Sequence, residues 1–233
     1  VGYPFHYTEN TRRARQILTS GELGKIQFVS CLMASMVIEF LRGKPDAYYN
    51  AATFPVVHPG SVYHDPRRSG GGQGHLQVTH SAASLFFITG LRAERVSAFM
   101  ESFDLPVDLV DAISVRFDGG AVGVIGSTGN TAPGDQGRLE IAVHCERGRL
   151  VMEQHQGTLY VRRHDGREES YGPLKEPYPR FATADNLVEV VLGKSPNGSP
   201  GEVGARVAEL LDAAYRSARA GGRAVSVASL YPH

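Results

Sequence analysis

The stretch LVDAISVRFDGGAVGVIGSTGNT, residues 109–131, consists of two strand-length runs separated by the turn sequence Asp118-Gly119-Gly120. Asp-Gly and Gly-Gly pairs between apolar runs are typical of β-hairpins. The same pattern continues on both sides of this stretch, with further turn signals at Arg147-Gly148 and Asp165-Gly166. Strands are expected within residues 94–104, 109–120, 121–131, 138–149, 150–157, 158–167 and 168–172. The sequence therefore predicts a consecutive antiparallel meander of six or seven strands.

Helical periodicity flanks the predicted meander. Residues 9–20 place Ala14, Ile17 and Leu18 on one face, and Gly21 follows as a stop signal. Further helices are expected at residues 77–90, 179–193 and 202–221, with short strands at 1–7, 25–37 and 222–227 and a long irregular loop at 43–69. This order predicts one α+β domain over residues 1–233, an open-faced, mostly antiparallel β-sheet with helices on one face.

Composition excludes several classes of protein. The chain has 24 basic and 24 acidic residues, so its charge balance gives no reason to expect nucleic acid or a membrane surface as partner. No apolar run reaches the roughly 18 residues of a membrane span, and no signal-peptide pattern opens the chain. Cys31 and Cys145 both lie in apolar, strand-like segments. Buried thiols in a reducing compartment are therefore expected, which indicates a cytoplasmic protein.

The stretch SGGGQGHLQVTH, residues 69–80, raises the question of phosphate binding. A dinucleotide fingerprint needs G-x-G-x-x-G between a buried strand and a helix. Gly70, Gly72 and Gly74 have the wrong last spacing, follow no buried strand, and have no acidic residue closing a second strand about 20 residues later. The glycines are instead expected to let the loop turn tightly and bring the helix start close to a pocket.

Histidines in the same stretch allow two kinds of chemistry. His75 and His80 are five positions apart and lack the i, i+4 spacing of zinc helices, although His58, His64 and Asp65 could complete a metal site after folding. We expect no metal ligands. A second set, Gln73, Gln77 and His80, falls at i, i+4 and i+7 along one helix stripe. Such a stripe can bind a polyhydroxy substrate while His80 exchanges a proton, or it can be a solvated helix face with His80 packed at a boundary.

Three runs together carry a resemblance to a known family. The runs HYTENTRRARQILTSGELGKIQFV (6–29), SGGGQGHLQVTHSAASLFFITG (69–90) and SARAGGRAVSV (217–227) resemble the C-terminal domain of the glucose–fructose oxidoreductase, inositol dehydrogenase and MocA family. That resemblance covers essentially the whole chain. It implies an open-faced sheet that builds a substrate pocket and commonly an oligomer interface.

The family typically has an N-terminal Rossmann domain that binds NAD or NADP and carries a catalytic Lys in a Glu-Lys-Pro motif. Neither feature occurs in this sequence, so the chain is expected to begin just after the nucleotide domain. We therefore expect the chain alone to bind no cofactor and to be inactive.

The resemblance also implies roles for individual residues. His80 matches a family histidine that serves in proton transfer, while the acidic position four residues earlier falls on Leu76 and another falls on Ala83. His75 and Gln77 flank the vacant position at Leu76 and can supply replacement polarity. His6 falls where relatives often place a basic residue that contacts substrate. The implied site is therefore His80 as catalytic residue, with substrate-binding residues Gln73, His75, Gln77 and His6.

Two functions of different classes follow from these observations. The first is the substrate-binding and oligomerisation domain of an NAD(P)-dependent oxidoreductase acting on a sugar, cyclitol or related polyol. The second is a catalytically silent binding or assembly module on the same scaffold, because the acidic partner is missing. A third, a metal-dependent hydrolase, depends only on the histidine-rich loop. A homodimer or tetramer through the sheet is also expected, with candidate apolar surface residues Val115, Val122, Val124, Ile141 and Val143.

Overall fold

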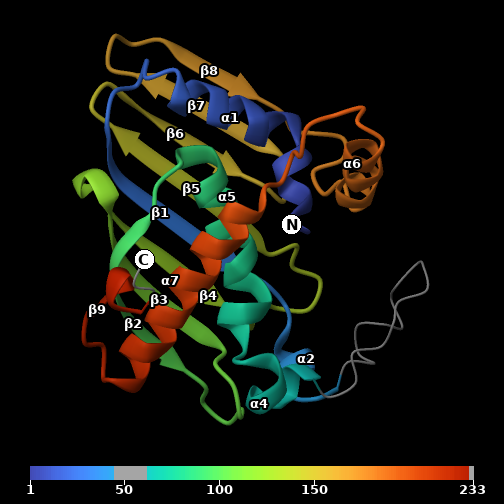
Figure 1. The fold of residues 1–233 in the computed structure, drawn as a ribbon, viewed down its shortest axis with the longest axis vertical. Helices are drawn as coiled ribbons and strands as arrows, with labels where there is room; N and C mark the ends of the chain where they lie inside the picture. Colours follow the sequence, from blue (N-terminus) through green and yellow to red (C-terminus); the bar gives the residue numbers. More distant parts are fainter. Residues whose placement is uncertain (45–61, 231–233) are drawn as a thin grey trace.

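A nine-stranded sheet forms the centre of the fold in the computed structural model, which describes residues 1–44 and 62–230 (Figure 1). Its strands lie in the order β8-β7-β6-β5-β1-β4-β3-β2-β9. Their bounds are β1 Ile26–Ala34, β2 Ala93–Glu101, β3 Val110–Phe117, β4 Val122–Thr128, β5 Arg138–Cys145, β6 Gly148–Glu153, β7 Thr158–Arg163, β8 Glu168–Tyr171 and β9 Val225–Ser226. The predicted α+β class and the seven strands between residues 93 and 171 are confirmed.

The prediction of one consecutive meander is wrong in its strand order. β1 lies between β4 and β5, parallel to β4 and antiparallel to β5, and so separates the meander β2-β3-β4 from the meander β5-β6-β7-β8. Residues 129–137 connect β4 to β5 across β1, and this segment is much longer than a hairpin turn. The alternation of apolar and polar residues indicates where a strand lies in the sequence but not which strands it pairs with. It therefore did not predict that β1 lies in the middle of the sheet.

Three helices cover one face of the sheet, as predicted (Figure 1). They are α1 Glu9–Thr19, α5 Thr79–Thr89 and α7 Gly201–Arg219, and α5 packs between the other two. Most of α5 is buried because its residues are apolar or small on nearly every side, and Gly90 ends it in the left-handed conformation. A fourth helix, α6 Ala182–Val191, stands at the side of this layer near the N-terminus and has no buried residue (Figure 1).

Short helices fill several connections. The described ones are α2 Ile38–Leu41, α4 Pro66–Ser69 and the 3₁₀ helices Pro4–Tyr7, Val62–His64, Asp118–Gly120 and Val227–Ser229. The strand expected at residues 1–7 is therefore wrong, because Pro4 starts a 3₁₀ helix that buries Phe5 and His6. The expected irregular loop at 43–69 contains helical turns after residue 62, and residues 45–61 of it lie outside the described part.

The opposite sheet face carries exposed apolar side chains. Phe28, Leu32, Val122 and Val124 are 37–48% exposed on the central strands β1 and β4. Of the four valines and one isoleucine expected to supply surface, Val122 and Val124 lie on this open face. The other three are buried under the helices, namely Val115, Ile141 and Val143.

Both cysteines are buried and unpaired, as the sequence predicted for Cys31 and Cys145. Burial raises the pKa of Cys31 to about 12 and that of Cys145 to about 11, so neither thiol is a ready nucleophile. Within residues 1–44 and 62–230, no helix has the length and apolar character that a membrane span requires.

Candidate functional site

The glycine-rich turn before α5 encloses a carboxylate of the protein itself. The backbone N–H groups of Gly72 and Gly74 donate to the two carboxylate oxygens of Asp108, each at 2.7 Å. The Tyr215 hydroxyl of α7 donates to the same carboxylate at 2.8 Å. A Cβ added to Gly72 would lie 2.1 Å from the backbone oxygen of Asp108. The glycines therefore allow Asp108 to approach the turn closely, and its carboxylate takes the backbone donors that a phosphate would need.

A second carboxyl group lies next to this turn. Asp111 of β3 is 2% exposed, and both its carboxyl oxygens are buried. Burial and the neighbouring Asp108 carboxylate raise the pKa of Asp111 to about 8, so this group is mostly protonated at pH 7. Asp111 pairs across the sheet with Ser127, whose hydroxyl accepts a hydrogen bond from Nε2 of Gln73 at 2.7 Å. The pair forms a buried polar layer beneath the turn.

The residues Gln77 and His80 meet at a cavity of about 410 Å³. Gln77 belongs to a π-helical turn, Gly74–Val78, that leads directly into α5, and His80 is the second residue of α5. π-Helical turns of this kind occur frequently at functional sites. The complete lining is Phe5, Met33, Ser35, Gln77, His80, Gln136, His155 and Tyr178. Among the described residues, no side chain lining this cavity carries a fixed charge.

The environment of His80 keeps its imidazole neutral. Burial lowers the pKa of His80, and a positive charge on His155 would lower it further. The Tyr3 ring meets the His80 ring edge-on, with centroids 5.8 Å apart. Nδ1 of His80 is buried and has no hydrogen-bond partner, which leaves Nε2 as the ring nitrogen available to a ligand. His80 can therefore accept a proton from a bound hydroxyl or donate a hydrogen bond to it.

Three of the predicted site residues lie away from this cavity, namely Gln73, His75 and His6. Gln73 is fully buried and reaches the cavity only through Ser35, whose hydroxyl accepts from Nε2 of Gln73 at 3.4 Å. His75 stacks on Tyr215, with centroids 4.8 Å apart, and lines a different cavity of about 420 Å³. The π-helical turn between Gln73 and Gln77 breaks the regular 3.6-residue period, so the three-residue stripe does not form as predicted.

His6 is held inside the core. Its Nδ1 is 2.8 Å from the Ser199 hydroxyl, and its ring stacks on Phe87 with centroids 4.1 Å apart. Burial lowers the pKa of His6 to about 4, so the residue is neutral at physiological pH. The structure brings Gln77 and His80 together at one cavity and places Gln73, His75 and His6 outside it.

Four polar residues of the cavity were missed by the sequence reasoning. Ser35 follows β1, Gln136 lies in the β4–β5 connection, His155 in the turn between β6 and β7, and Tyr178 in the segment after β8. The polar turn sequence EQHQG, residues 153–157, was a signal for His155. Its position beside α5 depends on the sheet order, which the sequence did not reveal.

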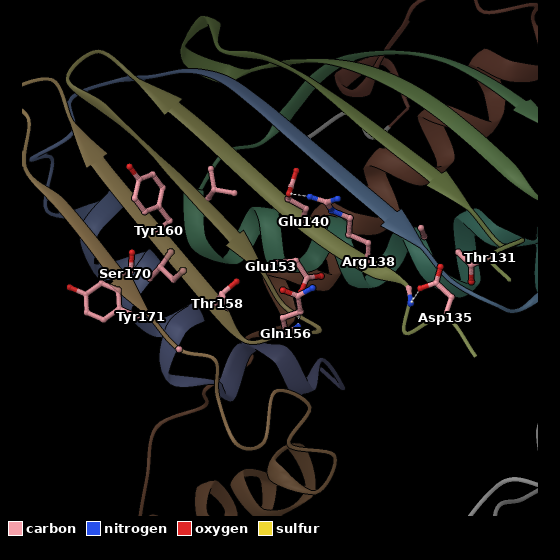
Figure 2. Close-up of a pocket in the computed structure, with 15 residues that line it drawn as sticks. Thr131, Asp135, Arg138, Glu140, Glu153, Gln156, Thr158, Tyr160, Ser170 and Tyr171 are labelled. Atoms are coloured by element: carbon pink, nitrogen blue, oxygen red, sulfur yellow. Dashed lines mark hydrogen bonds and ion pairs between the residues drawn. The ribbon is translucent and has the colours of Figure 1, made fainter. Parts of the chain in front are cut away.

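A larger cavity of about 770 Å³ lies on strands β5–β8, on the sheet side opposite α1 (Figure 2). Its charged groups are already used within the protein. Arg138 pairs with Glu140, and Glu153 accepts hydrogen bonds from the backbone N–H groups of Leu139 at 2.9 Å and Gln156 at 2.5 Å. We therefore assign the candidate active site to the smaller His80 cavity, where proton-exchanging nitrogens are free.

Two of the residues considered for a metal, His64 and Asp65, have partners within the protein. Nδ1 of His64 lies 2.8 Å from the backbone oxygen of Leu41, and the Asp65 carboxylate accepts from the backbone N–H of Arg67 at 3.0 Å. In the described ranges 1–44 and 62–230, no three His, Cys, Asp or Glu side chains are grouped to hold a metal ion. His58 lies outside those ranges.

Comparison with known proteins gives a family match. Residues 11–151 match the model of the GFO/IDH/MocA C-terminal domain. A search of curated proteins gives no match.

Solved structures share the fold at low sequence identity. An oxidoreductase domain protein from Kribbella flavida is 19% identical, with a TM-score of 0.75, and the match covers 97% of this chain and 65% of that one. Aldose-aldose oxidoreductase from Caulobacter crescentus, complexed with glycerol, is 19% identical, with a TM-score of 0.73 and coverage of 97% and 62%. An Agrobacterium radiobacter oxidoreductase in complex with NAD⁺, L-tartaric acid and magnesium is 15% identical, with a TM-score of 0.73 and coverage of 97% and 64%. The chain thus spans less than two thirds of each of these relatives.

Proposed function

The chain belongs to the GFO/IDH/MocA family, because it matches the model of that family's C-terminal domain, and from that premise we propose that it is the substrate-binding and oligomerisation domain of a nicotinamide-dependent oxidoreductase. Its substrate is a sugar, cyclitol or related polyol. The observation that carries this proposal is the His80 cavity, whose lining combines amides, hydroxyls and imidazoles with no fixed charge among the described residues. Such a lining suits an uncharged ligand with several hydroxyl groups, because each hydroxyl both donates and accepts hydrogen bonds.

The roles of the cavity residues follow from their chemistry. His80 takes the proton of the reacting hydroxyl, because its neutral ring presents Nε2 to the ligand. Gln77, Gln136 and Ser35 orient neighbouring hydroxyls, and Phe5 and Tyr178 supply apolar ring faces. The Caulobacter relative, crystallised with glycerol, is in keeping with a polyol ligand.

The nicotinamide cofactor, NAD or NADP, is proposed to bind outside this chain. The residues present do not fit a dinucleotide, because Asp108 already accepts the N–H groups of Gly72 and Gly74. Residues 1–44 and 62–230 also contain no helix joining two sequential, adjacent parallel strands, which a pyrophosphate site at a helix N-terminus requires. Calorimetric titration of the chain with NAD and NADP is expected to show no binding; micromolar affinity would contradict this part of the proposal.

The substrate site can be tested on the chain itself. Titration with myo-inositol and glucose, followed by ¹H–¹⁵N NMR, is expected to perturb residues that line the His80 cavity. Perturbation confined to the larger cavity of Figure 2, or none at millimolar ligand, would contradict the assignment. A His80→Ala variant provides the matched comparison, since it removes the central polar group of the cavity and leaves the larger one intact.

Self-association is the second part of the proposal. Phe28, Leu32, Val122 and Val124 expose apolar surface on the central strands of the open face. Sheet-on-sheet packing in a two-fold homodimer, or in a tetramer built from such dimers, would cover this surface. The equal numbers of basic and acidic residues support a protein without nucleic-acid or membrane partners. The buried free cysteines support a cytoplasmic location.

A catalytically silent binding or assembly module is the alternative function. It is favoured by one observation, the apolar residues Leu76 and Ala83 at the two positions where the family resemblance implies acidic residues. Ala83 is completely buried, and Leu76 packs against the cluster of Val37, Leu105 and Leu109. Turnover measurements separate the two functions, because a silent module gives none with any polyol when a nucleotide-binding domain is present.

A further inference from the structure

We propose that His155 is a second proton-handling residue of the His80 cavity, so that a pair of imidazoles works there without a carboxylate at Leu76 or Ala83. This inference rests on the proposed function of the cavity as a polyol site. It goes further by adding a catalytic residue that neither the sequence pattern nor the family match identifies.

The turn that carries His155 is held on both sides. Glu153, just before it, accepts hydrogen bonds from the backbone of Leu139 and Gln156. The buried Gln154 donates from Nε2 to the Thr11 hydroxyl at 3.0 Å. Behind His155, the backbone oxygen of Gly157 accepts from Nδ2 of Asn10 at 2.7 Å. A residue on a turn fixed in this way can hold a precise position relative to α5.

The His155 ring is placed by aromatic packing. It stacks on Phe5 with centroids 5.9 Å apart and an interplanar angle of 29°. Its Nδ1 is buried without a hydrogen-bond partner, as is Nδ1 of His80. In both rings, Nε2 is therefore the nitrogen left to a ligand in the cavity that they share. Two imidazoles with the same free nitrogen at one cavity form a matched pair.

Such a pair can carry one proton. When a ligand hydroxyl ionises, its O–H bond breaks, the electron pair stays on oxygen, and the proton forms an N–H bond at Nε2 of one imidazole. The other imidazole stays neutral, because two imidazolium charges at one partly buried site repel each other. It then donates or accepts a hydrogen bond at a second hydroxyl. In this arrangement no carboxylate is needed at Leu76 or Ala83.

Other titratable groups around His80 come from two further elements. Tyr3 and His6 face it from the N-terminal segment, and Tyr178 lines the cavity from the segment after β8. His6 is fully buried and has its Nδ1 at Ser199. Tyr178 has a pKa raised by burial, so it stays neutral across the range in which histidines titrate. His155 is therefore the cavity residue best placed to change the charge that His80 experiences.

The experiment is a histidine NMR titration of the chain, following the Cε1–H resonance of His80 against pH. In His155→Gln the pKa of His80 is expected to rise, because a nearby positive charge is removed. In His155→Glu it is expected to rise further, since a carboxylate stabilises the imidazolium. His164→Gln is the matched control, because His164 is an exposed histidine on the β7–β8 turn, and it should leave His80 unchanged. An unchanged His80 pKa in both His155 variants, folded by circular dichroism, would overturn the pairing.

Ligand addition separates this inference from the proposed function. Adding myo-inositol to the unmodified chain is expected to shift the His80 and His155 resonances together, with one saturation curve. If the His80 resonance shifts and that of His155 does not, the pair is wrong while the polyol site stands. If neither resonance shifts at millimolar ligand, the polyol site is wrong and the pair fails with it.

Discussion

The hydroxyl of Tyr215 donates to Oδ1 of Asp108 at 2.8 Å, which ties the last long helix, α7, to the glycine-rich turn before α5. The same carboxylate accepts the N–H groups of Gly72 and Gly74, so one side chain orders the turn that precedes the candidate site. Buried carboxylates that accept several hydrogen bonds of this kind stabilise a turn and stiffen it.

Removing the Tyr215 hydroxyl tests this tie. We expect Tyr215→Phe to lower the free energy of unfolding by roughly 1–3 kcal/mol, because the buried Asp108 carboxylate loses one of its three donors. Urea denaturation measures the change. Tyr160→Phe, in the larger cavity of Figure 2, is the matched control and should be close to neutral. Equal stability of the Tyr215 and Tyr160 variants would contradict the structural role given to Asp108.

The close approach at Gly72 gives a second test. Gly72→Ala places a Cβ 2.1 Å from the backbone oxygen of Asp108, which cannot move without shifting the turn. We expect a loss of roughly 1–3 kcal/mol or more in thermal or urea unfolding. In Gly201→Ala the new Cβ at the start of α7 meets no atom within 4 Å, so this variant should be neutral or slightly stabilising. A Gly72→Ala protein as stable as Gly201→Ala would rule out the observed packing.

Asp111 predicts a pH dependence of stability. The pKa of Asp111 in the folded protein is raised to about 8. Between the lower pKa that Asp111 has in the unfolded chain and pH 8, the folded state therefore binds one proton at this carboxyl that the unfolded state has lost. Stability from this group is therefore present at low pH and is lost as the pH rises through about 8. We expect Asp111→Asn to be roughly 1–3 kcal/mol more stable than the unmodified protein at pH 9 and to lose this advantage by pH 5. Urea denaturation across this pH range measures it, and a parallel pH profile for the two proteins would contradict the assignment.

The open sheet face predicts an oligomer. Val124→Asp puts a charge at the centre of the exposed apolar surface, so we expect it to convert a dimer or tetramer to monomers. Light scattering at micromolar concentration gives the mass directly. Val188→Asp is the control, since Val188 is 58% exposed on α6, away from this face. A monomeric unmodified protein, or dissociation by Val188→Asp alone, would count against association through the sheet.

The sequence predicted individual turns and helix ends better than it predicted which strands lie side by side in the sheet. The turn signal at Asp118-Gly119-Gly120 lies between β3 and β4, and Gly90 ends α5, because both features depend on a few adjacent residues. The position of β1 between β4 and β5 depends on contacts between segments about 100 residues apart, which no local period records.

The residues of the candidate site also differ in how well the sequence predicted them. His80 and Gln77 are neighbours in sequence and lie at one cavity, whereas His155 reaches that cavity from a distant turn. Gln73 was grouped with them because a regular helix was assumed. The π-helical turn Gly74–Val78 changes the angle between these side chains, and Gln73 instead binds Ser127 in the core.

Turnover of the enzyme that combines this chain with a nucleotide-binding domain tests the central claim, that His80 handles the proton of a polyol substrate. In steady-state assays that follow NADH or NADPH absorbance, we expect His80→Ala to lower kcat about a hundredfold or more. Gln77→Ala should mainly raise KM, because it orients the substrate without exchanging a proton. A folded His80→Ala enzyme with near-normal kcat would contradict the claim and return His80 to the role of a packed boundary residue.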